Sequence, residues 1–514
     1  MMRRTLDAPP GLRGTAPALN RTALLLVGIG IAAVAFVPRA TGLDRGFMID
    51  EKLWIERSTH FTNAVFDGRL RDAFTTGHPG VTTSWIAGLA QRTLPDDATL
   101  LQRYERARLA MAVVNVLVLL AIWLLARPLL GELAAGIGAL LLALDPFLLA
   151  HTRVVHLDGL QTLAMTASLV ALARGVRDDD RRMMAVAGAF AGVGFLTRTF
   201  AGFLLIAAVV ALWRDGRGIR RRLMALLVAA VVVIVGVWPL VWVRPWKAVS
   251  LLVSGAARGA AEDSDTGRFF LGAHIPAPGP IFYPVALALR ASIIGFLGGI
   301  ATAVWAVRRR RTEPAAKQAA WLLLYAIGFL AVVSLSLKTA DRYLLPALAA
   351  VDLAVAVALA RLLRERRAAM ACIALVAVAA LHAGPALALH PFELAHFDWA
   401  AGGPYAALRA IPIGRGEGLD VAARDLDRFP DGTKNLTVAT SRLTGFQEFF
   451  SGRTIRIEDS ALSRPGGKHA DLVLFYISSI QTGRVPAVWA RYRERKPLYV
   501  LRINHIPYVR VYRV

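Results

Sequence analysis

The segment that decides the fold is Thr22–Val37, TALLLVGIGIAAVAFV, an uninterrupted apolar run near the N-terminus. The next residues, PRATGLDRGFMIDE (38–51), are polar and end on the adjacent carboxylates Asp50 and Glu51. Pro38-Arg39 does not fit a signal-peptide cleavage site, so we predict an uncleaved first membrane helix. A carboxylate just beyond it is a candidate catalytic base for chemistry between a lipid-borne group and an acceptor in water.

Composition indicates a polytopic membrane protein. The chain has 514 residues, of which 56% are hydrophobic and 19% charged, against about 25% charged in a typical soluble domain. Apolar runs of about 20 residues, each able to cross a bilayer roughly 30 Å thick, recur along the chain. We predict about eleven transmembrane helices, near 22–38, 107–126, 133–150, 157–173, 183–197, 199–213, 223–243, 281–307, 319–337, 344–360 and 368–388.

The net charge of +24 does not indicate nucleic-acid binding, because the basic residues form short clusters between apolar runs. With the N-terminus in the cytoplasm, the short inner segments hold 23 Lys and Arg and the short outer loops hold four. This is the positive-inside pattern of a multi-pass protein of the cell membrane.

The predicted spans divide the chain into a membrane domain (1–388) and a C-terminal domain (389–514). A long outer loop, 39–105, carries Asp50, and a second outer segment covers 244–280. An odd number of spans places the C-terminal domain outside the cytoplasm. Short β-branched and aromatic runs predict a small α/β domain, with strands at Leu436–Thr440, Leu472–Tyr476, Leu498–Arg502 and Tyr508–Tyr512 and a helix at Gly418–Phe429.

Several common sites are missing from the sequence. There is no Walker A loop, and Gly28-Ile-Gly30 lies inside an apolar span, where small residues serve helix packing. The single cysteine, Cys372, excludes a disulfide scaffold. His390, Glu393, His396 and Asp398 have some metal-ligand character, but their spacing fits one helical face only partly. We interpret them as an interfacial segment and predict neither a metal site nor a cofactor.

The candidate catalytic carboxylates are Asp50, Glu51 and Asp158. Asp50 and Glu51 are adjacent, so on a helix their side chains point about 100° apart and have different roles. The alternative is that they cap a short helix. Asp158 lies at the outer start of the fourth span and Asp145 near the outer end of the third, at the membrane boundary, where acidic residues are often functional. The alternative for Asp158 is that it only caps its helix.

Cations also gather on the predicted outer side. Arginine binds phosphate bidentately, so a cluster of such residues suits a phosphate or diphosphate group. Snorkelling to lipid phosphates is the alternative for each single residue. The cations are Arg153, Arg198, Arg244, Arg258, Arg268, Arg290, Lys338 and Arg342.

Taken in order, these motifs resemble the membrane-embedded GT-C glycosyltransferases, in particular the group of protein O-mannosyltransferases and lipid A aminoarabinose transferase (glycosyltransferase family 39 and relatives). The set departs from the family at Gly80, where relatives usually have proline, and at Arg198, where many have lysine. The matching pieces are Asp50-Glu51; Gly77-His78-Pro79-Gly80 with Trp85; Asp145-Pro146 with Arg153 and Asp158; Leu196-Thr197-Arg198; Phe282-Tyr283-Pro284 with Arg290; and Lys338 with Arg342-Tyr343 and Pro346.

The resemblance implies a metal-independent, inverting transfer of a hexosyl or pentosyl group, mannosyltransferase-like, from a polyprenyl-phosphate donor. The acceptor would be a hydroxyl or phosphate of a lipid, glycan or protein outside the cytoplasm. Asp50 would be the general base or the group that positions the acceptor, and Glu51 would support it. The donor phosphate would be held by Arg198, Lys338, Arg342 and Tyr343; His78, Arg153 and Arg290 complete the predicted substrate-binding set.

Two other functions are compatible with a multi-span chain. A lipid or solute transporter or flippase commonly shows internal repeats and polar interruptions at mid-membrane, whereas here no repeat is visible and the polar residues gather at one face. A non-enzymatic assembly protein would leave Asp50 and the outer cations without a role. Glycosyl transfer is therefore the predicted function.

Overall fold

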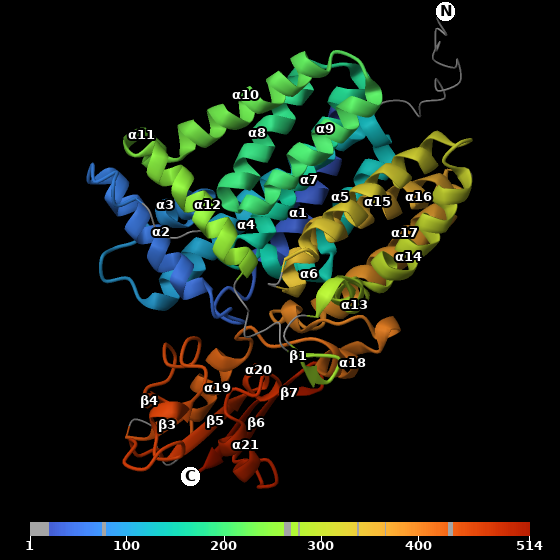
Figure 1. Cartoon of the computed structure of the whole chain (residues 1–514). Helices are drawn as coiled ribbons and strands as arrows, with labels where there is room; N and C mark the ends of the chain where they lie inside the picture. Colours follow the sequence, from blue (N-terminus) through green and yellow to red (C-terminus); the bar gives the residue numbers. More distant parts are fainter. Residues whose placement is uncertain are drawn as a thin grey trace, which may run out of the picture.

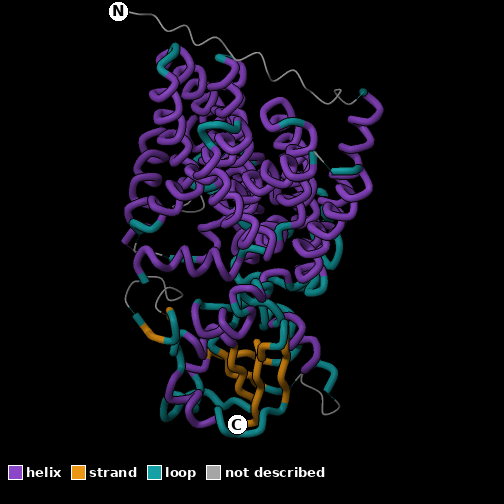
Figure 2. Tube along the Cα trace, turned by 90° about the vertical axis from the view of Figure 1, so that its right-hand side faces the viewer, coloured by secondary structure: helices purple, strands orange, loops and turns teal. Residues whose placement is uncertain are grey.

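The computed structural model describes residues 20–73, 79–261, 269–275, 278–336, 339–364, 366–429 and 435–514. His78 and Lys338 lie outside these ranges. The helices from α1 to α17 form one body, and the strands of the C-terminal domain form a smaller layer at one end of it (Figure 1, Figure 2). The fold is thus a polytopic helical protein with a small C-terminal α/β domain, as predicted.

Within the described ranges, six helices are long and apolar enough to cross a membrane, and two bent helix pairs raise the number to eight if each pair is one span. The six are α1 (Arg21–Ala40), α4 (Leu100–Leu130), α7 (Asp158–Asp178), α15 (Pro314–Val333), α16 (Leu345–Leu363) and α17 (Ala368–Leu387).

The two bent pairs correspond to single spans in the sequence prediction. The first pair, α5 (Glu132–Leu144) and α6 (Pro146–Thr152), bends by 65°. Asp145 has extended ψ of 124° there, because a residue before proline is disfavoured in helical conformation. The second pair, η2–α13 (Gly279–Arg290) and α14 (Ile293–Arg309), bends by 119°.

Three further predicted spans are helical but do not meet the criteria of length and hydropathy. These are α8 (Arg181–Thr197), α9 (Phe203–Asp215) and α10 (Ile219–Val237). With 17 and 13 residues, α8 and α9 are about 25 and 20 Å long, and α10 begins with Arg220–Arg222. The sequence prediction of eleven spans is therefore higher than the number that length and composition support.

Two groups of helices in this body lie outside the predicted spans or at their ends. The first outer loop contains α2 (Glu51–Phe66) and α3 (Val81–Gln91), which pack against each other and against α4. After α10, the chain forms α11 (Pro239–Val243) and α12 (Pro245–Ala261), and then the hairpin β1 (Phe269–Phe270) and β2 (Ala273–His274).

The C-terminal domain is built on a five-stranded sheet of order β4–β3–β5–β7–β6, in which β3 pairs parallel with β4 and β5 while β7 pairs antiparallel with β5 and β6. All four predicted strands are present; β4 was missed because its sequence, RTIR, is a polar edge strand. The strands are β3 (Thr437–Thr440), β4 (Arg453–Arg456), β5 (Leu472–Tyr476), β6 (Tyr499–Ile503) and β7 (Ile506–Arg513).

Helices cover both faces of this sheet. Leu472 and Leu474 of β5 pack in the same core as α19 (Leu419–Leu426), and Val473 and Phe475, which alternate with them, pack against α21 (Pro486–Tyr492). The predicted helix Gly418–Phe429 is α19. The remaining helices of the domain are α18 (Gly403–Ala410) and α20 (Ile477–Gln481).

Close packing of α8 on α10 gives a first prediction. A Cβ added at Gly188 would lie 2.0 Å from the Leu226 backbone oxygen, whereas a Cβ at Gly236 of α10 would meet no atom within 4 Å. Gly188→Ala forces the two backbones apart and should cost about 1–3 kcal/mol. We expect a lower thermal midpoint of the detergent-solubilised protein for Gly188→Ala and little change for Gly236→Ala. Equal midpoints for both variants would contradict this packing.

Candidate functional site

The candidate site is a cluster of charges where the first outer loop meets the membrane helices. Asp50 precedes α2, and its Oδ2 lies 3.2 Å from Arg342 Nη1 and 3.4 Å from His156 Nε2. The Nε of Arg342 lies 3.3 Å from Asp158 Oδ2 at the start of α7, and the Nδ1 of His156 lies 3.0 Å from the same oxygen. Arg342 and the His156 ring therefore each lie between two carboxylates.

Arg198 and Tyr343 extend the cluster. The Arg198 guanidinium donates to Asp158 Oδ1 and lies 4.5 Å from the centroid of the Tyr343 ring and 4.8 Å from that of Phe200. Arg198 follows the last residue of α8, and Tyr343 lies in the short helix η3 (Asp341–Leu344). The structure thus brings together four residues selected from the sequence, Asp50, Asp158, Arg198 and Arg342, with Tyr343 beneath them.

The C-terminal domain adds a second ion-pair group. Asp341 accepts from Arg290 of α13, with 2.8 Å between Nε and Oδ2, and forms an ion pair with Arg415. Two more donors of Arg290 are not available to a substrate, because its Nη1 donates to the carbonyls of Leu394 and His396. Arg290 is a buried residue that positions Asp341 and hence the neighbouring Arg342.

Exposure separates Asp50 from the other carboxylates of the cluster. Its side chain is 39% exposed, whereas those of Asp158 and Asp341 are 3% and 2% exposed. Burial alone would raise the pKa of Asp50. The hydrogen bond to His156 and the charges of Arg342 and Arg415 outweigh that effect and hold its pKa well below the ordinary range. Asp50 is therefore an ionised carboxylate open to solvent.

Glu51 points away from Asp50 into the protein. It is fully buried and forms an ion pair with Arg108 of α4, whose Nε lies 2.8 Å from Glu51 Oε1. The backbone N–H groups of Met48 and Val155 also donate to this carboxylate, at 2.8 and 2.9 Å. Glu51 thereby joins the Asp50 loop to the turn that carries His156, so its contribution is to position Asp50.

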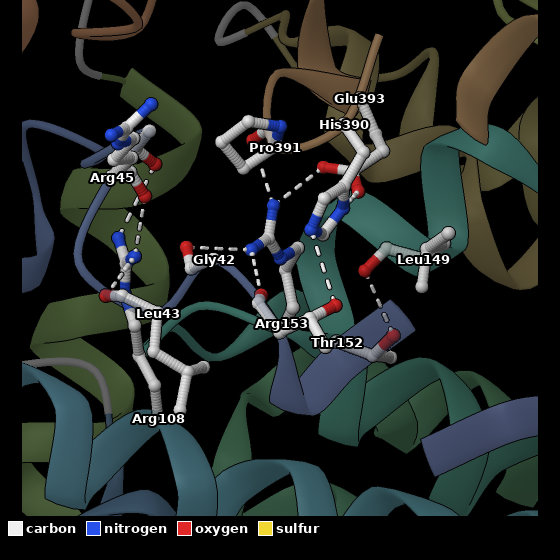
Figure 3. Close-up of polar contacts among 12 residues, drawn as sticks. Gly42, Leu43, Arg45, Arg108, Leu149, Thr152, Arg153, His390, Pro391 and Glu393 are labelled. Carbon is white, nitrogen blue, oxygen red and sulfur yellow. Dashed lines mark hydrogen bonds and ion pairs between the residues drawn. The ribbon is translucent and has the colours of Figure 1, made fainter. Parts of the chain in front are cut away.

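Arg153 is likewise engaged by the protein itself (Figure 3). Its Nη1 donates to Glu393 Oε2 at 2.8 Å and to the Pro391 carbonyl at 2.7 Å, and its Nη2 donates to the carbonyls of Thr41 and Gly42. The structure does not place Arg153 against Asp50. It fastens the first outer loop to the segment that leads into the C-terminal domain.

The side chains of His390 and Glu393, considered in the sequence as metal ligands, form ion pairs and hydrogen bonds within the protein. Glu393 pairs with Arg153 and accepts from His390 at 2.6 Å. Asp398 caps the turn that follows, accepting from the Ala400 N–H at 2.9 Å. Among the described residues, the group whose ligand atoms lie close enough together for a metal ion is a different one, Asp145, Asp352 and His382.

A cleft lies beside the cluster on the C-terminal side. It has a volume of about 690 Å³ and is lined by Ile49, by the Ser441–Thr444 loop, and by Arg456, Glu458, Asp459 and Arg484. The loop follows β3 and Arg456 ends β4, so the cleft lies at the carboxyl ends of two parallel strands, where α/β sheets commonly bind ligands. Its wall includes the residue that precedes Asp50.

Sequence reasoning missed three members of the cluster. His156 was not selected, although it lies two residues before Asp158. Asp341 was overlooked beside Arg342. Arg415 carries no local signal, because 74 residues separate it from Asp341. The predicted substrate-binding residues His78 and Lys338 lie outside the described residues.

The chain resembles known proteins in part of its sequence and in its fold. Residues 99–242 match the family model described as dolichyl-phosphate-mannose-protein mannosyltransferase. A search of curated proteins gave no match. The fold is similar to crystal structures of ArnT from Cupriavidus metallidurans: one bound to undecaprenyl phosphate (TM-score 0.53, 15% identity, 96% of this chain and 98% of that chain covered), and one in the apo state (TM-score 0.53, 16% identity, 95% and 98% covered). The resemblance found in the sequence is confirmed.

The buried Glu51–Arg108 pair gives a second prediction. Removing one partner of a buried ion pair typically costs about 3–5 kcal/mol, because the other charge stays buried. We expect Glu51→Gln to lower the thermal midpoint by several degrees and to loosen the Asp50 loop. Glu56→Gln, an exposed change on the same helix, is the matched control. Increased cleavage of the 39–50 segment in limited proteolysis of Glu51→Gln would report the loosening; unchanged stability and cleavage would refute this role.

Proposed function

We propose that this chain is a GT-C membrane glycosyltransferase and that it transfers a sugar from a polyprenyl-phosphate donor to an acceptor outside the cytoplasm. The observation that supports this best is the convergence of one solvent-open carboxylate, Asp50, with two arginines, Arg198 and Arg342, where α7 begins and α8 ends. Direct displacement at a sugar phosphate needs a carboxylate that can accept a proton and cations that can bind the phosphate.

Arg342 and Arg198 are proposed to hold the donor phosphate. When the sugar leaves, negative charge develops on the phosphate oxygens, and fixed cations in a site shielded from water stabilise that charge. Asp158 contacts both arginines and keeps them in place without a donor. The relative bound to undecaprenyl phosphate supports a lipid phosphate as the ligand.

Asp50 is proposed to act as the base. The acceptor oxygen forms a bond to the anomeric carbon while its proton passes to Asp50, and the bond from that carbon to the phosphate oxygen breaks with its electron pair on the phosphate. A single displacement of this kind inverts the anomeric configuration. Of the carboxylates in the cluster, Asp50 is the one whose exposure allows an external acceptor to reach it.

Donor binding would also prepare the base. A carboxylate with a strongly lowered pKa accepts a proton weakly, and Arg342 is one cause of that lowering. A phosphate anion that shares Arg342 adds negative charge beside Asp50 and raises its pKa. The site would thus become more basic only when the donor is present, which limits unproductive protonation of Asp50.

The cleft beside Ile49 is the proposed entry for the acceptor. It joins the Asp50 loop to the C-terminal domain, and its lining combines cationic Arg456 with anionic Glu458 and Asp459. Such a polar lining suits a hydroxyl-rich glycan or a polar lipid head group. With the cleft on the face away from the basic inner loops, the acceptor is extracytoplasmic and the N-terminus cytoplasmic.

Asp50→Asn keeps the size of the side chain but removes the proton acceptor. We expect turnover to fall by about 10²–10⁴, the usual contribution of a positioned general base, with folding and donor binding retained. Mass spectrometry of cell-envelope lipids, glycans and proteins from cells with the wild type and with Asp50→Asn would identify the modified acceptor. Asp44→Asn, an exposed aspartate in the same loop, is the control. Wild-type product levels in Asp50→Asn would remove Asp50 from the mechanism.

Arg342→Ala should weaken donor binding and shift the pH profile. A hydrogen bond to a charged group contributes about 1.5–3 kcal/mol, so we expect at least a tenfold higher Kd for a short-chain polyprenyl phosphate. In the wild type Asp50 stays ionised below its ordinary pKa of about 3.9, and the acid limb of kcat/KM lies lower still. Loss of Arg342 raises that pKa, and the limb moves to higher pH. Arg45→Ala is the control; an unchanged Kd and limb would contradict the proposal.

A further inference from the structure

Both helix breaks of the membrane domain meet at one buried group of polar side chains. Asp145 lies at the break between α5 and α6, and Ser292 lies at the break between α13 and α14. Asp352 of α16 and His382 of α17 complete the group. The ligand atoms of Asp145, Asp352 and His382 all lie within 4.8 Å of one another.

The carboxylates of this group lack partners. Both are fully buried, and neither oxygen of Asp352 has a hydrogen-bond donor. Asp145 accepts from the Leu148 N–H at 2.7 Å through Oδ1, while its Oδ2 has none. Three carboxylate oxygens without donors are costly in the interior of a membrane protein unless a positive charge neutralises them.

One guanidinium, that of Arg39, acts on Asp145 through its charge but makes no hydrogen bond to it. Arg39 donates through Nη1 to the carbonyls of Ala35 and Ala143, at 2.7 and 2.9 Å, and through Nε to Thr152 Oγ1 at 2.8 Å. Its Nη2 has no hydrogen-bond partner among the described residues. The three open oxygens of Asp145 and Asp352 thus remain without a donor, and Asp352 has no cation paired with it in that part of the chain.

His382 and Ser292 have the orientation of further ligands. The Nε2 of His382 lies 2.9 Å from the Leu141 carbonyl, so Nε2 carries the proton and the lone pair is on Nδ1. That nitrogen accepts a hydrogen bond from the Ser292 hydroxyl, with 2.5 Å between Nδ1 and Oγ, and a bound ion would replace this hydrogen bond. A Cβ added at Gly295 would lie 3.5 Å from both Ser292 Oγ and Asp352 Oδ1. The imidazole is held through its other nitrogen by a backbone carbonyl, as in many metal-binding histidines.

We propose that Asp145, Asp352 and His382, with Ser292 as a weaker fourth ligand, bind a divalent metal ion, zinc by preference. Two carboxylates and one imidazole are ligands that zinc takes readily, and its charge would balance both aspartates. None of these residues belongs to the Asp50 cluster. The ion would hold together the α5–α6 break, the start of α14, α16 and α17.

Such an ion would position the catalytic turn without touching a substrate. It would fix Asp145, the residue before α6, and the segment that follows α6 carries His156 and leads to Asp158 at the start of α7. The proposal stands independently of the proposed function, because it concerns the stability of the membrane domain and the metal content of the purified chain.

The test uses the full-length protein in detergent, purified without a polyhistidine tag. Elemental analysis should find about one zinc per chain after gel filtration. Prolonged treatment with a chelator should remove it and lower the thermal midpoint, and added zinc chloride should restore both. Asp352→Asn and His382→Gln should lose the zinc and its thermal effect. Asp398→Asn and His396→Gln, the same changes at buried residues outside the group, should retain them.

The absence of a bound metal would give a different set of results. If the two aspartates share a proton, the wild type contains no stoichiometric metal, and its thermal midpoint responds to neither chelator nor zinc. Asp352→Asn would then be as stable as the wild type or more stable, since an unpaired buried carboxyl has been replaced. That combination would overturn the proposal. The wild-type measurements decide the question even if a variant does not fold.

Discussion

Arg342 is the residue on which the candidate site depends, because it is shared by two carboxylates from distant parts of the chain. Its Nη1 contacts Asp50 of the first outer loop, and its Nε contacts Asp158 of α7. A buried cation shared in this way draws the loop onto the helices. Asp50 is the more exposed of the two carboxylates, so a phosphate that bound Arg342 would change the environment of Asp50 more than that of Asp158.

Three further ion pairs join the segments that surround the contact between Asp50 and Arg342. Glu51–Arg108 anchors the loop to α4, Arg153–Glu393 anchors it to the entry of the C-terminal domain, and Asp341–Arg415 joins η3 to that domain. Each pair is buried or nearly so, and each joins segments far apart in sequence. The adjacent residues Asp50 and Glu51 therefore have different roles. The Glu51 side chain is buried and anchors the loop, whereas the Asp50 side chain is open to solvent, in line with the angle of about 100° between neighbouring side chains on a helix.

Much of the architecture could be predicted from local patterns. The apolar runs located most of the helices, and a short β-branched and aromatic run located β5, the central strand of the C-terminal domain. The orientation inferred from the distribution of arginine stays a prediction. The helix breaks were missed at Asp145 and Ser292 because apolar composition continues across them. The helices α8 and α9 are short in the structure, as are the apolar runs 183–197 and 199–213 from which they were predicted.

By itself, the sequence determined the class of the protein, the membrane and C-terminal domains, and the set of charged residues from which the site is built. Only the tertiary structure decided which of these lie open to solvent and which neutralise one another in the interior. Arg153 and Arg290 resemble Arg342 in the sequence, yet their donors are taken by carbonyls and buried carboxylates. The physical reason is that a charge removed from water must find a partner, and partners such as Arg415 for Asp341, or Asp352 beside Asp145, come together only when the chain has folded.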